Sequence, residues 1–167
     1  MHLILCGMMG AGKTTVALAL AKQTGRKCLD TDEELVKRHG RISDIFARFG
    51  EGYFRDLETQ TIQELLQTED LIISVGGGLV LRSENVDILR KTGKIVYLRA
   101  SLDTLTERLQ GDMARPLLQD DKEGLREKLT RLLDARSPIY EQAADLVVDV
   151  DAKTPDEIAR ELLKKLG

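Results

Sequence analysis

The sequence has only two cysteines, Cys6 and Cys28, no tryptophan, and 4% aromatic residues in a chain of 167. Two cysteines cannot build the disulfide framework of a small secreted protein, so we expect a reduced, cytoplasmic protein. The scarcity of aromatic side chains argues against a surface on which nucleic-acid bases stack. No apolar run approaches the ~18 residues of a membrane-spanning helix, so we expect no membrane association.

Neither sign of charge dominates the composition. Lys and Arg number 25 and Asp and Glu number 28, for a formal net charge of −3. This balance gives no general reason to expect binding to nucleic acid or to an anionic membrane. With 42% hydrophobic and 32% charged residues, the chain has the composition of a globular protein, and its length suits a single domain over residues 1–167.

Five short apolar runs alternate with segments of helical pattern. The runs are typical of buried strands and lie at 3–6, 27–30, 71–75, 94–98 and 146–150. Helices are expected at 14–24, 33–39, 42–49, 53–66, 83–91, 101–109, a long stretch that ends at 136 and resumes after Pro138, and 155–166. This alternation predicts an α/β protein: a parallel sheet with helices on both faces and its sites beyond the carboxyl ends of the strands.

Residues 7–14 read GMMGAGKT and match the phosphate-loop pattern G-x-x-x-x-G-K-[ST]. The motif follows an expected strand and opens an expected helix, as its mechanism requires. Its amides would bind phosphate oxygens, Lys13 would reach the β and γ phosphates, and the Thr14 hydroxyl would serve Mg²⁺. The single asparagine, Asn85, lies outside any guanine-reading Asn-Lys-x-Asp motif, which disfavours a GTPase and leaves ATP as the expected ligand.

Asp30, Thr31 and Asp32 end the second expected strand. On extended backbone, two carboxylates one residue apart share a side, so both would face the crevice beside the phosphate loop. One could then serve a metal and the other an acceptor hydroxyl. The alternative is structural, with Asp32 or Thr31 capping the helix that follows.

Six motifs, in their order and spacing, resemble those of the shikimate kinase family, which are small nucleoside-monophosphate-kinase-like P-loop proteins. The resemblance runs nearly end to end and rests on residues 7–14, 30–32, 54–58, 76–78, 115–118 and 136–140. It implies a three-layer α/β/α fold with a parallel sheet ordered 2-3-1-4-5, a substrate-binding helical region at about 33–61 and a lid at about 110–122. In that order the strands of Cys6 and Cys28 are not neighbours, so no disulfide is expected.

The resemblance also implies a reaction: ATP-dependent phosphorylation of the 3-hydroxyl of shikimate, within aromatic amino acid biosynthesis, by a monomeric protein with Mg²⁺ as cofactor. Thr14 and, through water, Asp30 would hold Mg²⁺. Lys13, Asp32 and Arg115 would be catalytic. The residues implied in nucleotide binding are Gly10, Ala11, Gly12, Lys13, Thr14, Thr15, Arg108 and Arg115. Those implied in shikimate binding are Asp32, Arg55, Gly77, Gly78 and Arg136, with Glu58 as the partner of Arg55.

Several of these residues also have a purely structural interpretation. Arg55 and Arg136 could form two ordinary surface ion pairs, that of Arg55 with Glu51 or Glu58 on its own helix, and Arg115 could lie in a solvated loop. Residues 76–78 could be only a tight turn, although three glycines exceed what a turn needs and favour close approach by a ligand. His2 and His39 have no metal-ligand partner at a suitable spacing and are expected at the surface.

Three other functions remain open from the sequence. A kinase for another small hydroxy acid, such as gluconate, would also need a carboxylate clamp. A nucleoside monophosphate kinase would need a base pocket, which the short segment between the second and third strands does not evidently offer. A regulatory module could bind nucleotide through the same phosphate loop without transferring phosphate.

Overall fold

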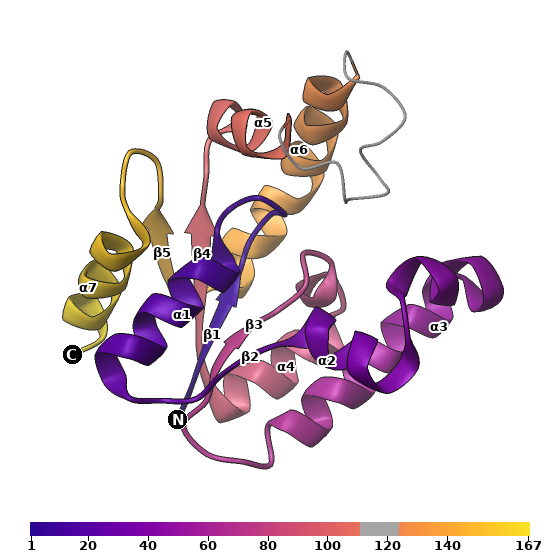
Figure 1. Ribbon diagram of the computed structural model, residues 1–167, viewed down its shortest axis with the longest axis horizontal. Helices are drawn as coiled ribbons and strands as arrows, with labels where there is room; N and C mark the ends of the chain where they lie inside the picture. The colour runs from indigo at the N-terminus through magenta and orange to yellow at the C-terminus, as the bar shows by residue number, and fades with distance from the viewer. Residues whose placement is uncertain (111–123) are drawn as a thin grey trace.

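The strands of the computed structural model form one parallel five-stranded sheet in the order β2-β3-β1-β4-β5 (Figure 1). The structure describes residues 1–110 and 124–167. Within these residues the strands are β1 His2–Cys6, β2 Cys28–Asp30, β3 Ile72–Ser74, β4 Gly93–Arg99 and β5 Leu146–Asp149. The helices are α1 Lys13–Thr24, α2 Thr31–His39, α3 Ile42–Leu65, the 3-10 turn η1 Leu79–Leu81, α4 Ser83–Thr92, α5 Leu102–Gln110, α6 Leu125–Ala143 and α7 Pro155–Leu166. The predicted strand order and fold class are confirmed.

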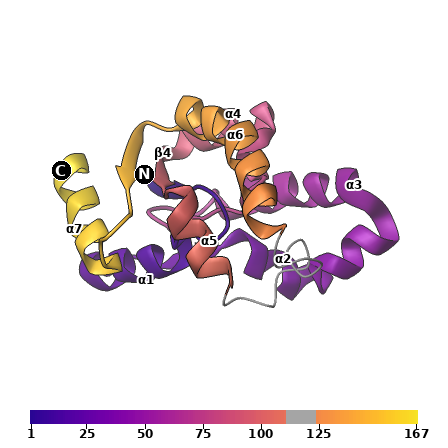
Figure 2. The ribbon, with the colours of Figure 1, turned by 90° about the horizontal axis from the view of Figure 1, so that it is seen from above.

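Helices cover both faces of the sheet, which explains why its strands are continuous apolar runs. Figure 2 shows α1 and α7 on one face and α4 and α6 on the other. β1, at the centre, is buried along its whole length. Cys6 on β1 and Cys28 on β2 are both free, with β3 between their strands, so the absence of a disulfide is confirmed.

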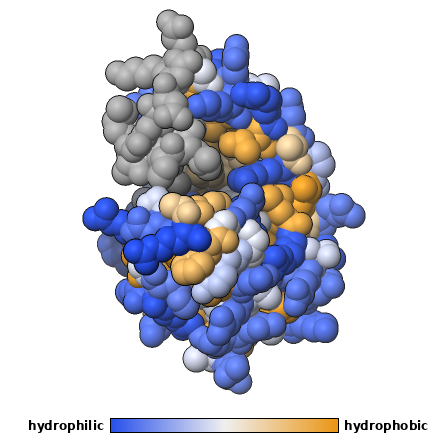
Figure 3. Space-filling model, turned by 90° about the vertical axis from the view of Figure 1, so that its right-hand side faces the viewer, coloured by the Kyte–Doolittle hydropathy of each residue, from blue (hydrophilic) through white to orange (hydrophobic). Residues whose placement is uncertain are grey.

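The helical region formed by α2 and α3 extends away from the sheet (Figure 1). It has a small hydrophobic cluster of its own, made by Leu35, Ile45, Phe54 and Leu57. The two helices predicted at 42–49 and 53–66 form one element, α3, which is interrupted only at Gly50, where φ is 83°. Figure 3 views the molecule from this side and shows a mainly hydrophilic surface with separate hydrophobic areas.

Two local expectations are wrong. His2 is not at the surface: it is buried in β1, and its Nδ1 accepts a hydrogen bond of 3.2 Å from the Leu71 amide. α6 does not end near residue 136; it continues through Pro138 to Ala143.

Within the described residues, no helix is both long and apolar enough to cross a membrane.

Candidate active site

The loop between β1 and α1 holds the phosphate-loop motif at the carboxyl edge of the sheet. Gly12 precedes α1 with φ 90°, a left-handed conformation that favours glycine. The Lys13 ammonium donates to the carbonyls of Gly7 and Met8, at 2.6 and 3.2 Å, so its charge lies within the loop. From α5, Arg108 donates to the Gly10 carbonyl at 3.0 Å. A helix N-terminus and two cations therefore surround the loop, a suitable site for phosphate oxygens.

Asp30 is the residue through which β2, α1 and α2 meet. It ends β2, and its Oδ1 accepts hydrogen bonds from the amides of Asp32 and Glu33, at 2.9 and 3.2 Å, as the N-cap of α2. Its Oδ2 accepts from the Thr14 hydroxyl at 3.0 Å. The capping prediction is therefore wrong, because Asp30, rather than Asp32 or Thr31, caps this helix.

Asp32 lies in the first turn of α2, so Asp30 and Asp32 do not share a side of extended backbone as predicted. It reaches the site from the helix instead. A methyl group added at Gly76 would lie 2.8 Å from Asp32 Oδ1 and 3.1 Å from Glu58 Oε2. These two carboxylates therefore meet on the same side of the glycine segment that follows β3.

Gly76, Gly77 and Gly78 form what we call the glycine turn, between β3 and η1. A methyl group at Gly77 would lie 3.3 Å from Arg136 Nη1, and one at Gly78 would overlap the Arg55 guanidinium. Close approach was predicted for a ligand, yet on these sides of the turn the close neighbours are side chains of the protein. The glycines are needed because any side chain here would displace a residue of the site.

The two arginines predicted to bind one carboxylate contact consecutive glycines. Arg55 comes from α3 and Arg136 from α6, and adjacent α-carbons are only about 3.8 Å apart. Arg55 also forms the ion pairs of the structural alternative, at 2.7 Å to Glu58 and 3.4 Å to Glu51. Half-buried Arg136 has no carboxylate within 4.0 Å among the described residues. Arg136 therefore forms no ion pair with the described part of the protein.

Glu58 anchors Arg55 from inside the protein. The Glu58 side chain is 1% exposed, and burial raises the pKa of its carboxyl above the ordinary value, while Arg55 acts in the opposite direction. The Asp32 carboxylate also raises this pKa by repulsion. Glu58 thus holds the Arg55 guanidinium against Gly78 at the expense of burying a carboxylate.

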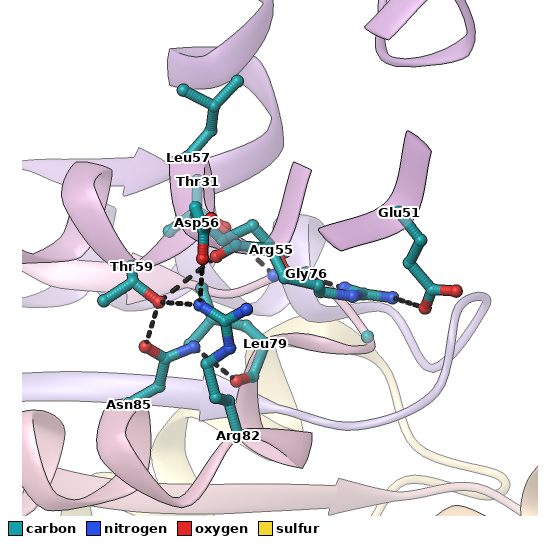
Figure 4. A network of polar contacts seen from close by, with 12 residues as sticks. Thr31, Glu51, Arg55, Asp56, Leu57, Thr59, Gly76, Leu79, Arg82 and Asn85 are labelled. Atoms are coloured by element: carbon teal, nitrogen blue, oxygen red, sulfur yellow. Dashed lines mark hydrogen bonds and ion pairs between the residues drawn. The ribbon is translucent and has the colours of Figure 1, made fainter. Parts of the chain in front are cut away.

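A hydrogen-bond network that the sequence analysis did not identify joins α3 to α4 and η1, next to the glycine turn (Figure 4). Thr59 donates to buried Asn85 at 2.7 Å, and Asn85 donates to the Leu79 carbonyl at 2.8 Å. Arg82 extends the network to Asp56 at 2.9 Å. Thr31 accepts a hydrogen bond from the Gly76 amide at 3.0 Å. No local sequence pattern identifies these polar residues as a network, because the partner of each lies on another element.

The structure thus brings most of the predicted site residues to one edge of the sheet. Gly10, Ala11, Gly12, Lys13, Thr14 and Thr15 lie in the phosphate loop and the first turn of α1. Asp32, Arg55, Gly77, Gly78 and Arg136 meet at the glycine turn. Arg115, together with the expected lid apart from Gln110, lies outside the described residues.

Metal-ligating side chains are few at this edge. Within residues 1–110 and 124–167, no group of three His, Cys, Asp or Glu side chains could hold a metal ion by itself. The oxygens of Thr14 and Asp30 are the donor type that Mg²⁺ prefers, and Mg²⁺ commonly takes its other ligands from water and substrate phosphates. This pair of residues fits a magnesium ion bound together with a nucleotide.

A phosphate loop after β1 and a parallel sheet ordered 2-3-1-4-5 are the features of the P-loop kinase fold. The family model described as shikimate kinase matches residues 9–167. A curated shikimate kinase from Thermodesulfovibrio yellowstonii is 42% identical and covers 98% of this chain and 94% of its own length. The chain belongs to the shikimate kinase family.

Solved structures give the same result. A shikimate kinase from Acinetobacter baumannii in complex with shikimate matches with a TM-score of 0.92 at 35% identity, over 99% of this chain and 92% of that one. A shikimate kinase from Bacteroides thetaiotaomicron matches with a TM-score of 0.91 at 31% identity, over 99% and 97% of the two chains.

Replacing Glu58 tests whether the buried pair holds α3 in place. We expect Glu58→Ala to lower the free energy of unfolding by about 3 kcal/mol, because it leaves Arg55 without its buried partner. Asp56→Ala is the matched control on the same helix: its carboxylate is 74% exposed and pairs with Arg82, so the loss should stay below about 1 kcal/mol. Urea unfolding at pH 7 measures both, and equal losses would contradict the assignment.

Proposed function

We propose that this protein transfers the γ-phosphoryl group of ATP to the 3-hydroxyl of shikimate, giving shikimate 3-phosphate and ADP for aromatic amino acid biosynthesis. The observation that carries the proposal is the placement of Arg55 and Arg136 against consecutive glycines. These glycines directly follow β3, which pairs with the strand that leads into the phosphate loop, β1. The family match and the similar Acinetobacter baumannii enzyme in complex with shikimate support the choice of acceptor.

The phosphate loop would bind ATP. The amides of residues 10–15 would bind the phosphate oxygens, and Lys13 would neutralise charge on the β and γ phosphates. Arg108, held at the loop by Gly10, would lie against the adenine. Thr14 and, through water, Asp30 would hold Mg²⁺, which when bound offsets the negative charge of the phosphates.

The glycine turn would bind the acceptor. Paired guanidinium donors match a carboxylate, so Arg55 and Arg136 together would bind that of shikimate. The amides of Gly77 and Gly78 donate to no acceptor among the described residues, which supports their use by the ligand's hydroxyl side. Arg55 keeps donors for a ligand while bound to Glu58, because a guanidinium carries five N–H groups.

Catalysis would depend mainly on position and electrostatics. Asp32, on the first turn of α2, would align the 3-hydroxyl with the γ-phosphorus and accept its proton. Lys13 and Arg115 would stabilise the charge on the transferring phosphoryl group. Water must be kept away from ATP until the acceptor is bound, and we assign this task to a lid at about 110–122.

The organisation of the chain follows from these assignments. We assign acceptor binding to the helical region at about 33–61, because α3 carries Arg55 and its own hydrophobic cluster. All the assigned residues come from one chain of a single domain, which supports a monomeric enzyme. The two free cysteines are consistent with a reducing, cytoplasmic location.

A coupled assay of ADP release distinguishes this function from the alternatives. Shikimate should stimulate release, whereas gluconate and nucleoside monophosphates should not. Stimulation by gluconate alone would place the acceptor in another class of hydroxy acids, and stimulation by a nucleoside monophosphate would require a base pocket. ATP binding without release in any mixture would indicate a regulatory module.

The role of Asp32 predicts a specific loss of turnover. Asp32→Asn should lower kcat by about 10²–10⁴-fold, because the amide retains the shape but accepts no proton. Glu33→Gln is the matched control: it removes one charge from the same helical turn at an exposed position, and its kcat should be unchanged. A nearly normal kcat for Asp32→Asn would remove Asp32 from proton transfer.

The role of Arg136 predicts weaker binding of one substrate only. Arg136→Lys should raise the KM for shikimate by about 10- to 100-fold, the equivalent of ~1.5–3 kcal/mol for a charged hydrogen bond lost. The KM for ATP should not change. Arg131→Lys, an exposed position on the same helix, serves as the control. A rise in the KM for ATP while the KM for shikimate stays unchanged would show that the carboxylate clamp is misassigned.

A further inference from the structure

Tyr140 is a buried side chain to which neither the sequence nor the proposed function gives a role. It lies on α6, four residues after Arg136, so the two side chains share one face of the helix. It is fully buried, and its hydroxyl donates a hydrogen bond of 2.5 Å to the carbonyl of Gly77. A buried phenol normally needs such a partner, and here the partner is the backbone of the proposed acceptor site.

This hydrogen bond determines the direction of one peptide group. The carbonyl of Gly77 and the amide of Gly78 belong to the same peptide plane, and the described residues contain no cis peptide bond. In a trans peptide the two groups point in opposite directions. Because the Gly77 carbonyl points at Tyr140, the Gly78 amide must point away from it, toward the side where no described residue accepts its hydrogen bond.

A peptide between two glycines needs such a constraint more than any other. Without a β-carbon on either side, the rotation that exchanges the carbonyl and amide directions meets little steric resistance. The neighbouring carbonyls are already fixed: that of Gly76 accepts from the Leu79 amide at 3.1 Å, and that of Gly78 from the Leu81 amide at 3.2 Å. Only the carbonyl of Gly77, between them, depends on a side chain.

The same hydroxyl lies next to Arg136. A methyl group at Gly77 would be 3.3 Å from Arg136 Nη1 and 3.6 Å from the Tyr140 hydroxyl, so both groups lie on the same side of Gly77. Burial raises the pKa of Tyr140 to about 12, and the positive charge of Arg136 opposes this rise. Tyr140 therefore stays protonated at neutral pH and remains a donor.

We propose that Tyr140 is a positioning residue of the acceptor site: by binding the Gly77 carbonyl beside Arg136, its hydroxyl keeps the Gly78 amide directed at the acceptor. The proposal rests on the proposed function in taking the acceptor to bind at the glycine turn. Tyr140 does not touch the acceptor. It acts through a peptide group that would otherwise have two orientations.

Tyr140→Phe removes a single oxygen atom and should leave the fold intact. We expect the KM for shikimate to rise about tenfold, because a buried carbonyl loses its partner and the Gly78 amide is no longer held. The KM for ATP should not change. A purely structural role would lower the melting temperature and leave the ratio of the two KM values unaltered.

Tyr97→Phe is the matched control. The Tyr97 ring packs against that of Tyr140 with centroids 5.1 Å apart, and it is equally buried. Its hydroxyl makes no hydrogen bond to the glycine turn, and the residue lines a separate cavity with Ser137 and Leu133. Removing the Tyr97 hydroxyl should leave the KM for shikimate and the KM for ATP unchanged. The same rise in the KM for shikimate with Tyr97→Phe would overturn the proposal, because the effect would then come from general loosening.

A second measurement, by NMR, does not depend on enzymatic activity. Residues 77 and 78 are the two positions at which one glycine follows another, so protein made with [¹³C,¹⁵N]glycine gives carbonyl-to-amide NMR correlations for these two amides only. Tyr140→Phe should shift, broaden or double the Gly78 signal in the absence of any ligand, and Tyr97→Phe should not. Unchanged signals would overturn the proposal even if the KM rose, and a changed signal with a normal KM would overturn its link to the acceptor.

The two readouts also separate this proposal from the proposed function. If the wild-type protein released no ADP with shikimate, the proposed function would fail. The Gly78 signal would still show whether Tyr140 fixes the peptide. If the wild type were active and Tyr140→Phe changed neither KM nor spectrum, only the positioning role would be lost.

Discussion

Close packing around three consecutive glycines determines where the side chains of the candidate acceptor site lie. Asp32 and Glu58 approach Gly76, Arg136 approaches Gly77, and the Arg55 guanidinium lies against Gly78. These side chains come from α2 and α3, which pack against each other, and from α6, which packs against η1, the turn's neighbour in the sequence. The turn is therefore the surface against which side chains of three helices are aligned, and a β-carbon at any of its positions would move one of them.

The two arginines at the glycine turn differ in their ion pairs. Two carboxylates and two guanidinium groups meet there. Arg55 pairs with buried Glu58 and with Glu51, whereas Arg136 has no carboxylate within 4.0 Å among the described residues. A chain with a formal net charge of −3 can thus present a local positive potential to an anionic acceptor, because placement rather than composition determines the local field.

Local signals in the sequence were sufficient for the phosphate loop and for the central sheet. The motif at 7–14 needs only its own backbone, and continuous apolar runs such as β1 can be accommodated only between two helical layers. The family resemblance supplied the strand order and the residues of the acceptor site, whose roles stay predictions. Sequence reasoning failed where a residue depends on a distant partner. His2 is buried against Leu71 and Tyr140 binds Gly77, and no periodicity or spacing in the sequence indicates such pairs.

The two halves of the site differ in how they are built, and one strand pair joins them. The phosphate loop follows β1 and the glycine turn follows β3, which pair in parallel with Leu5 opposite Ser74. Immediately beyond this pair the Val75 amide donates to the Leu5 carbonyl at 3.0 Å, and both residues are buried. A shift of one residue in this register would move the glycine turn by about 3.3 Å relative to the phosphate loop. The buried β1–β3 ladder therefore sets the distance between the phosphate loop and the glycine turn.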